Sequence, residues 1–146
     1  MVFRFPNVVG ERSTHGAVYD FIAKLKNNPS ELQVLGDGRQ TKPYLYVSDL
    51  IDAIELAWAK ARGPLDVYNA AGDGATSVKT IAETVVARFG RPDTKILYAG
   101  GDRGWPGDVP RFAYDTSKLR GLGWSPQRDS DAAIVLTIDR IAQNGF

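Results

Sequence analysis

Apolar and polar residues follow two different periods along this chain, and each period predicts one kind of element. Short apolar runs bounded by glycine, proline or asparagine predict strands. These runs lie at residues 2–9, 32–35, 44–47, 66–71 and 94–98, and Pro6 interrupts the first. Between them, apolar residues recur every three or four positions, which is typical of amphipathic helices. Strands that alternate with helices favour an α/β fold.

The second period predicts about five helices, at residues 18–25, 48–61, 78–89, 115–120 and near the C-terminus at 134–141. Ser48 and Asp49 are N-cap-type residues that would open the second helix. Its apolar stripe would comprise Leu50, Ile54, Ala57, Trp58 and Ala61. Ser77 would cap the third helix and Gly90 would stop it. Acids on the helix faces are expected to be solvated, namely Asp52, Glu55, Glu83 and Asp139.

Composition narrows the class of protein. The 146 residues suffice for one domain with a real core, and 43% hydrophobic with 24% charged residues is typical of a globular protein. A net charge of +1 gives no strong field for nucleic acid or an acidic membrane, so neither is expected as a partner. There is no cysteine and no apolar run long enough to span a bilayer. We therefore expect a cytoplasmic protein.

Residues Gly36 to Leu50 read GDGRQTKPYLYVSDL and combine three unlike signals. A Gly-Asp-Gly turn tolerates positive φ, a short β-type run follows, and N-cap-type residues then open a helix. Lys42 lies between the turn and the strand, where its charge would face an anionic ligand. A solvated loop lysine is the alternative.

Two further features are judged structural. Gly72-Asp73-Gly74 follows a strand and precedes a helix, as a dinucleotide fingerprint would, but Ser77 occupies the sixth position and no acidic strand end follows. A plain turn before a capped helix is therefore favoured. His15 is the single histidine, and without cysteine or a GxSxG elbow it supports neither a zinc site nor a hydrolase triad.

Several segments together resemble one family. The stretch from Gly36 is similar to the GDGxQxRDxxxVxD segment of the extended short-chain dehydrogenase/reductases, the NAD-dependent sugar-nucleotide epimerases and dehydratases. RFPNVVG at 4–10 resembles its R-Y/F-x-N-x-x-G segment, and YNAAGDGATSVKTIAETV at 68–85 resembles YNxGxGxxxSxxELA. Asp115, Lys118, LGW at 122–124 and Pro126 match its closing pattern, in which Trp124 is expected in the core. The resemblance runs from about Arg4 to Pro126, and UDP-glucose 4-epimerase-like proteins are the most similar.

The resemblance implies four substrate-binding residues, Asn7, Lys42, Arg103 and Asp108. Asn7 would bind the diphosphate or the sugar, because an amide donates to phosphate oxygen without a charge of its own; capping a turn is the alternative. Lys42 stands where the family has an arginine, so it would meet the diphosphate as a flexible point charge. Within GDRGWPGDV at 101–109, Arg103 would contact the diphosphate and Asp108 the ribose.

The resemblance also implies a fold, the C-terminal sugar-nucleotide-binding part of an extended Rossmann-type epimerase, with mixed short strands. Residues 1–146 would form a single substrate-binding domain without the N-terminal NAD-binding Rossmann domain. Family members use a Tyr-x-x-x-Lys pair that precedes the segment resembled by residues 4–10. The one tyrosine here with a lysine four residues later is Tyr114, and its Lys118 belongs to the closing pattern instead. NAD is thus expected for the full-length family enzyme but not for this chain alone, which should not transfer a hydride.

Three hypotheses follow. In the first, the chain is the substrate half of an NAD-dependent epimerase or dehydratase that binds a nucleoside-diphosphate sugar, with UDP-sugar favoured. It is then either a piece of a longer enzyme or partnered by a separate N-terminal Rossmann chain. Alternatively, it is a non-catalytic module that binds a nucleotide sugar or a protein. As a third possibility, it is a structural piece whose apolar surface drives self-association. The sequence favours the first.

Overall fold

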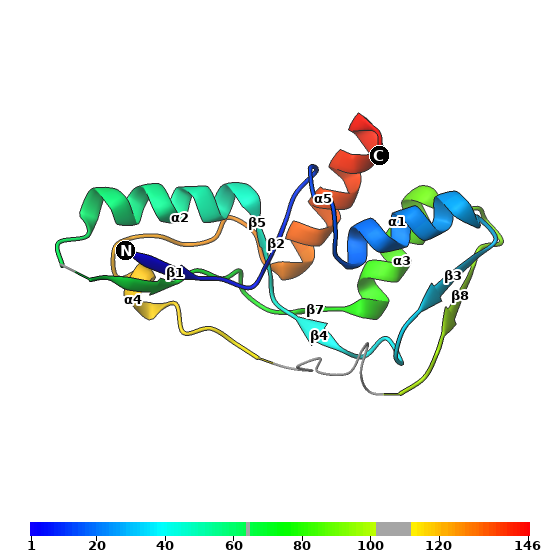
Figure 1. Cartoon of the computed structure of the whole chain (residues 1–146), viewed down its shortest axis with the longest axis horizontal. Coiled ribbons are helices and arrows are strands. Elements are labelled where there is room, and N and C mark those ends of the chain that lie inside the picture. Colours follow the sequence, from blue (N-terminus) through cyan, green and yellow to red (C-terminus); the bar gives the residue numbers. More distant parts are fainter. Residues whose placement is uncertain (64, 102–111) are drawn as a thin grey trace.

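The computed structural model describes residues 1–63, 65–101 and 112–146. Helices and strands alternate in it, which confirms the expected α/β class (Figure 1). The helices are α1 (Ala17–Asn27), α2 (Val47–Lys60), α3 (Val78–Phe89), α4 (Ser117–Arg120) and α5 (Ser130–Asn144). The strands are β1 (Val2–Arg4), β2 (Asn7–Val9), β3 (Glu31–Val34), β4 (Thr41–Lys42), β5 (Tyr44–Tyr46), β6 (Val67–Asn69), β7 (Thr76–Ser77) and β8 (Lys95–Tyr98).

The strands pair two by two. β1 pairs with β6, β2 with β5 and β3 with β8, all in parallel, whereas β4 and β7 are antiparallel. Parallel strands need a crossover between them, and the helices supply it. No helix in the described ranges is both long and apolar enough to cross a membrane.

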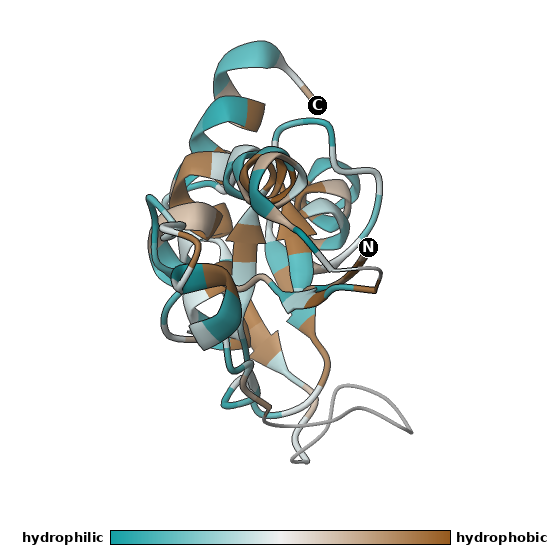
Figure 2. Ribbon diagram, turned by 90° about the vertical axis from the view of Figure 1, so that its left-hand side faces the viewer, coloured by the Kyte–Doolittle hydropathy of each residue, from teal (hydrophilic) through white to brown (hydrophobic). Residues whose placement is uncertain are grey.

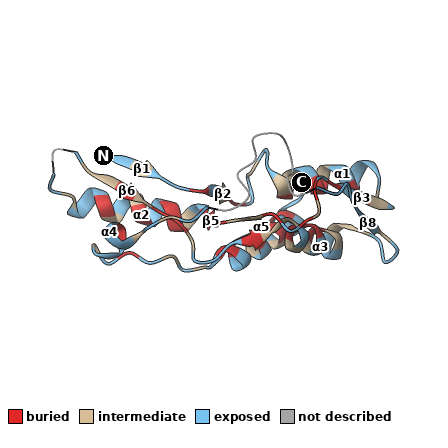
Figure 3. Ribbon diagram, turned by 90° about the horizontal axis from the view of Figure 1, so that it is seen from below, coloured by how far each residue is buried: buried red, intermediate tan, exposed pale blue. Residues whose placement is uncertain are grey.

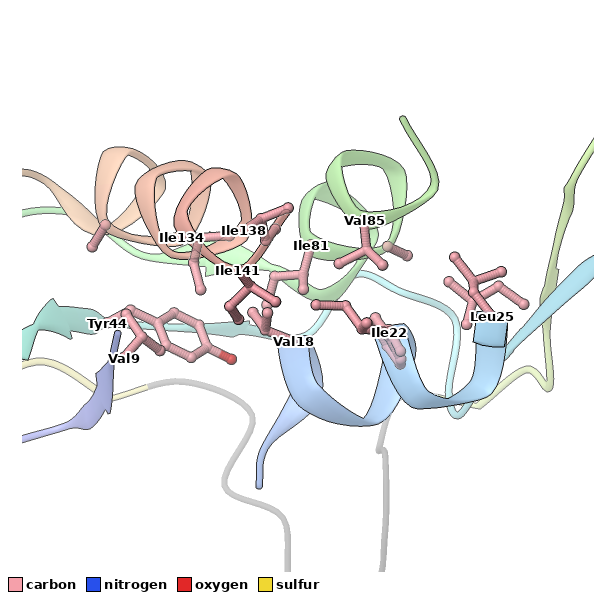
Figure 4. Packing of buried hydrophobic residues seen from close by; sticks show 14 of the residues in the cluster. Val9, Val18, Ile22, Leu25, Tyr44, Ile81, Val85, Ile134, Ile138 and Ile141 are labelled. Carbon is pink, nitrogen blue, oxygen red and sulfur yellow. The ribbon is translucent and has the colours of Figure 1, made fainter. Parts of the chain in front are cut away.

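Buried side chains form two cores, one towards each end of the long axis. The first lies among α1, α3, α5 and β3, where Ile22, Ile81 and Ile138 are fully buried (Figure 4). The second lies under α2 and α4 and includes Leu50, Leu119 and Trp124. Hydrophobic residues, brown in Figure 2, line the central strands, and buried residues, red in Figure 3, extend from α2 through β5 towards α5.

Strand β5 joins the two cores. Tyr44 and Tyr46 belong to the first core and Leu45 belongs to the second, because successive side chains of a strand point to opposite faces. All three residues are buried. The strand is therefore covered on both sides although it is only three residues long.

Helix α2 differs from the expectation in two respects. It begins at Val47 with Tyr46 as N-cap and no capping side chain, so the prediction that Ser48 and Asp49 open it is wrong. The Asp49 carboxylate is instead fully buried and pairs with Arg128 at 2.9 Å, so it does not cap the helix. Trp58, predicted within the apolar stripe, is 78% exposed.

Other local predictions are confirmed. Ser77 caps α3 by accepting a hydrogen bond from the Thr80 amide at 2.9 Å, and that helix ends before Gly90. Trp124 is buried and donates its indole N–H to the Asp49 carbonyl at 3.1 Å. The acids Asp52, Glu55 and Glu83 are exposed as expected. Asp139 is only half-buried and pairs with Arg88 at 2.6 Å.

Buried hydroxyl groups attach the start of α5 to the strands. The Ser130 hydroxyl accepts a hydrogen bond from the Tyr44 amide at 3.0 Å and shares another with the Thr76 hydroxyl at 2.7 Å. Ser130 and Thr76 are each 1% exposed, so water does not replace these bonds. They fix β5 and β7 against α5, and they hold the backbone on either side of Lys42.

We expect Ser130→Ala to lower the free energy of unfolding by about 1–3 kcal/mol, because the buried Tyr44 amide loses its acceptor. Urea unfolding followed by circular dichroism measures this change. Ser125→Ala, at an exposed serine, is the control and should change stability by less than about 0.5 kcal/mol. Equal stability of the two variants would contradict the role assigned to Ser130.

Candidate functional site

The structure brings Asn7 into the neighbourhood of Lys42. Asn7 is the first residue of β2 and lies opposite Tyr44 in the parallel β2–β5 register. Lys42 ends β4, and one residue, Pro43, separates it from β5. Asn7 is exposed and Lys42 is half-buried. Two residues predicted from distant motifs thus lie on adjacent segments.

Lys42 is held in place through its backbone. It lies opposite Thr76 in the antiparallel β4–β7 pair. Its carbonyl accepts a long hydrogen bond, 3.4 Å, from the Ser130 hydroxyl. The buried Thr76 and Ser130 therefore fix the backbone position from which the Lys42 side chain starts.

Arg103 and Asp108, the other two candidates, lie outside the described residues. Their assignment remains a prediction.

A hollow of about 370 Å³ lies next to Pro43, the residue that follows Lys42. It is lined by Pro43, residues 71–75, residues 112–114 and Thr116. Pro43 follows Lys42 directly, and the Tyr114 hydroxyl donates to the carbonyl of Phe5, two residues before Asn7, at 3.1 Å. Pockets for small ligands begin at about 300 Å³, so this hollow is large enough for part of a nucleotide sugar.

The Gly-Asp-Gly turn at 36–38 has a structural role. Gly36 and Gly38 adopt positive φ of 77° and 81°, as expected. The carbonyls of Gly38 and Gln40 accept hydrogen bonds from the backbone amides of Lys79 and Val78, the first residues of α3. The turn therefore satisfies helix amides that would otherwise lack partners.

Gly72-Asp73-Gly74 is a turn closed by contacts within the chain. A side chain at Gly72 would come within 2.6 Å of the Tyr44 carbonyl. The Asp73 carboxylate pairs with Arg120 at 2.6 Å, and its carbonyl accepts from the Ser130 amide at 2.8 Å. These contacts fit the plain turn favoured by the sequence rather than a cradle for pyrophosphate.

Gln40 is a polar residue that sequence reasoning missed. It lies two positions before Lys42, is 4% exposed, and neither atom of its side-chain amide has a hydrogen-bond partner within the described structure. A buried amide without partners costs about 1–3 kcal/mol. The sequence signal that could have found Gln40 is the strand period of two, because residues 40 and 42 then lie on the same side of the backbone.

A second hollow, of about 390 Å³, lies at the start of α2 and is lined by residues 8–13 and Val47. At its edge the Tyr46 hydroxyl donates to the Glu11 carboxylate at 2.8 Å. The pKa of Glu11 is lowered from its ordinary 4.5, first by its own backbone amide and then by this hydroxyl. The pKa of Tyr46 is raised from 10.0, first by burial and then by Glu11.

No metal centre is evident within the described ranges, where no three histidine, cysteine or acidic side chains gather. His15 is exposed in the loop before α1. Neither observation adds a catalytic group to the site.

Comparisons with known proteins identify what the chain resembles. The model of the NAD dependent epimerase/dehydratase family matches residues 1–71. A dTDP-glucose 4,6-dehydratase of Xanthomonas campestris pv. campestris (strain B100) is 35% identical over 118 residues, which are 74% of this chain and 32% of that protein.

Two crystal structures show the same fold. One is a UDP-galactose 4-epimerase, 33% identical with a TM-score of 0.79, in which 99% of this chain covers 45% of that chain. The other is the UDP-glucuronic acid 4-epimerase of Bacillus cereus in complex with UDP-glucuronic acid and NAD, 25% identical with a TM-score of 0.76, covering 99% and 46%. The chain spans between about a third and a half of the length of these relatives.

We expect the Glu11–Tyr46 bond to give stability that depends on pH. Because folding lowers the pKa of Glu11, its carboxylate stabilises the folded chain in full above pH 4.5. This stabilisation is lost as the pH falls through the pKa of Glu11 in the folded chain. Because folding raises the pKa of Tyr46, its neutral hydroxyl stabilises the folded chain in full below pH 10.0. This stabilisation is lost as the pH rises through the pKa of Tyr46 in the folded chain. Tyr46→Phe should therefore cost most, about 1 kcal/mol, between these limits.

Urea unfolding of the wild type and Tyr46→Phe at about pH 7 and about pH 4 measures the change on the acid side. In the Glu11→Gln background, which has no carboxylate to titrate, the cost of Tyr46→Phe should not vary between these pH values. If the stability cost of Tyr46→Phe were also the same at both pH values with Glu11 present, the role assigned to the Glu11–Tyr46 bond would be refuted.

Proposed function

The chain belongs to the NAD-dependent epimerase/dehydratase family, and from this premise we propose that it binds a nucleoside-diphosphate sugar as the substrate half of such an enzyme. A UDP-sugar is the favoured ligand, since two of the related structures are named for UDP-sugar epimerases and one contains UDP-glucuronic acid. The observation that carries the proposal is that Asn7 and Lys42 lie on adjacent segments around β5, with the 370 Å³ hollow next to Pro43.

Each residue has a stated role in the proposal. The Lys42 ammonium neutralises charge on the diphosphate, and the Asn7 amide donates to a diphosphate or sugar oxygen. Arg103 binds the diphosphate and Asp108 the ribose, on the strength of the resemblance alone. A lysine cannot match the two-pronged grip of an arginine on phosphate, so we expect a weaker contact at position 42 than an arginine would give.

NAD belongs to the other half in this proposal. The glycine-rich turn at 72–74 is held by the Asp73–Arg120 pair and by the close approach of Gly72 to the Tyr44 carbonyl, which supports placing the dinucleotide in the other half. The one tyrosine with a lysine four residues later is Tyr114, whose hydroxyl donates to the Phe5 carbonyl while Lys118 pairs with Asp66. We therefore assign binding and orientation of the substrate to this chain and derive no hydride transfer from it.

A non-catalytic binding module is the alternative, and it is favoured because Tyr114 and Lys118, which have the Tyr-x-x-x-Lys spacing, contact Phe5 and Asp66 instead. The two functions differ in one outcome. A substrate half gains turnover of UDP-glucose when the dinucleotide-binding half of a relative is added, whereas a binding module holds the nucleotide sugar without ever turning it over.

Calorimetric titration of the chain with UDP-glucose, UDP and GDP tests the proposal. We expect saturable binding of the two uridine compounds and weaker binding of GDP. Lys42→Ala should weaken UDP binding by about 1–3 kcal/mol through loss of a charge-assisted contact, whereas Lys42→Arg should preserve or strengthen it.

Lys95→Ala is the matched control, because Lys95 is an exposed lysine on β8 at the far end of the molecule (Figure 1). Equal affinities of Lys42→Ala and Lys95→Ala would remove Lys42 from the site. Absence of binding to all three nucleotides would count against an independently formed pocket.

A further inference from the structure

Asn144 and Gly145 form the one Asn-Gly pair of this sequence. Asn144 is the last residue of α5 and is exposed, and Gly145 follows it with a positive φ of 86°. Glycine adopts this region of φ without strain and has no side chain to shield its own amide. A side chain built at Gly145 would meet no atom of the described structure within 4 Å, apart from its neighbours in the chain. The amide of Asn144 is therefore followed by an unhindered backbone N–H.

The backbone N–H of Gly145 makes no hydrogen bond within the described residues. The residues that follow α1, α2 and α3 differ, because the amides of Asn28, Ala61 and Gly90 each donate to a carbonyl of the helix before them. Such a bond holds the N–H in the last turn of the helix. Where it is missing, the last turn frays and the amide is open to water and to base.

The other four asparagines have different neighbours. The amides after Asn27 and Asn69 each donate to a backbone carbonyl, at 2.8 and 2.9 Å. Asn28 precedes a proline, which has no N–H, and Asn7 lies within the paired strand β2. Among these residues, Asn144 alone combines a free neighbouring amide with a neighbour that has no side chain.

We propose that Asn144–Gly145 is a site of spontaneous deamidation. The Gly145 nitrogen loses its proton to hydroxide and bonds to Cγ of Asn144, and the side-chain nitrogen of Asn144 leaves as ammonia. Water then opens the resulting succinimide ring at one of its two carbonyl carbons. Opening at one carbon gives aspartate, and opening at the other gives isoaspartate, in which the backbone runs through the side chain. Water is the only co-reactant, and no atom is oxidised or reduced.

The residue after this pair attaches the end of α5 to α1 (Figures 1 and 3). The centroids of the Phe146 and Tyr19 rings lie 4.8 Å apart. The Lys26 ammonium lies 4.6 Å from the centroid of the Phe146 ring and donates to the Phe146 carbonyl at 2.8 Å. Isoaspartate adds a methylene carbon to the backbone between α5 and Phe146. The Phe146 ring is thereby displaced from both partners.

Deamidation also adds a negative charge to the end of α5. A carboxylate at the C-terminal end of a helix faces the negative end of the helix dipole, which is unfavourable. The longer backbone and the new charge therefore act in the same direction, and both loosen the last turn of α5. This inference goes beyond the proposed function and does not depend on it.

Incubation of the whole chain in mildly alkaline buffer, followed by peptide mass spectrometry, tests the proposal. The peptide that contains Asn144 should show the replacement of NH₂ by OH at least about tenfold faster than the peptides that contain Asn27 or Asn69, because glycine hinders ring closure least. Protein isoaspartyl methyltransferase, which methylates isoaspartate, should label the same peptide. Asn144→Gln is the matched control, since glutamine keeps the amide but must close a larger ring, and it should show no such replacement.

Hydrogen exchange of the α5 backbone amides measures the structural consequence. After incubation, the last turn of α5 should exchange severalfold faster, as it should in Phe146→Ala, where the attachment to α1 is removed directly. Incubated Asn144→Gln should exchange like the fresh wild type. Asn144→Asp, which has the charge but an ordinary backbone, should fall between the two.

The proposal is overturned if the Asn144 peptide is deamidated no faster than the Asn69 peptide. It is also overturned if the incubated chain contains isoaspartate at position 144 but its α5 amides exchange like those of the fresh wild type.

Discussion

The arrangement of this protein depends on burying the three residues of β5 on both faces. Tyr44 and Tyr46 complete the core among α1, α3 and α5, while Leu45 between them completes the core under α2. The Tyr44 amide is satisfied by the hydroxyl of Ser130 at the start of α5. One short strand thereby fixes the positions of helices at both ends of the molecule.

The same constraint locates the candidate site. Because β5 is immobilised from both sides, the residues just before it, Lys42 and Pro43, are held at the junction of the two cores. β2 pairs with β5 and brings Asn7 to this junction as well. The proposed anion-binding residues, Asn7 and Lys42, therefore lie on backbone that is fixed by β5. A fixed backbone suits a site that must hold a ligand in one orientation.

Periodicity and capping rules predicted most elements, because these features are local. The helix containing Val18 and Leu25 and the Ser77 cap follow from neighbouring residues alone. The start of α2 could not be predicted, because a buried ion pair with Arg128, far along the chain, takes Asp49 into the interior. Trp58 was placed on the wrong side for a related reason, since the sequence does not say which of two apolar stripes meets the core.

The sequence nominates residues for the candidate site but does not predict their geometry. The order of motifs pointed to Asn7 and Lys42, yet nothing local reveals that β2 pairs with β5 and so brings them together. Gln40 escaped notice because its interest lies in burial without partners, a property of the folded chain.

The parallel pairings also constrain how this chain folds. Val2 lies opposite Val67 and Glu31 opposite Lys95, so each pairing closes a loop of more than sixty residues, about half of the chain. Closing such loops costs conformational entropy before any contact compensates for it, and domains dominated by distant contacts fold slowly. Because β5 contributes side chains to both cores, neither core can be completed before the other. Folding of this chain is therefore expected to be slow but concerted, with its apolar helix faces exposed until β5 is in place.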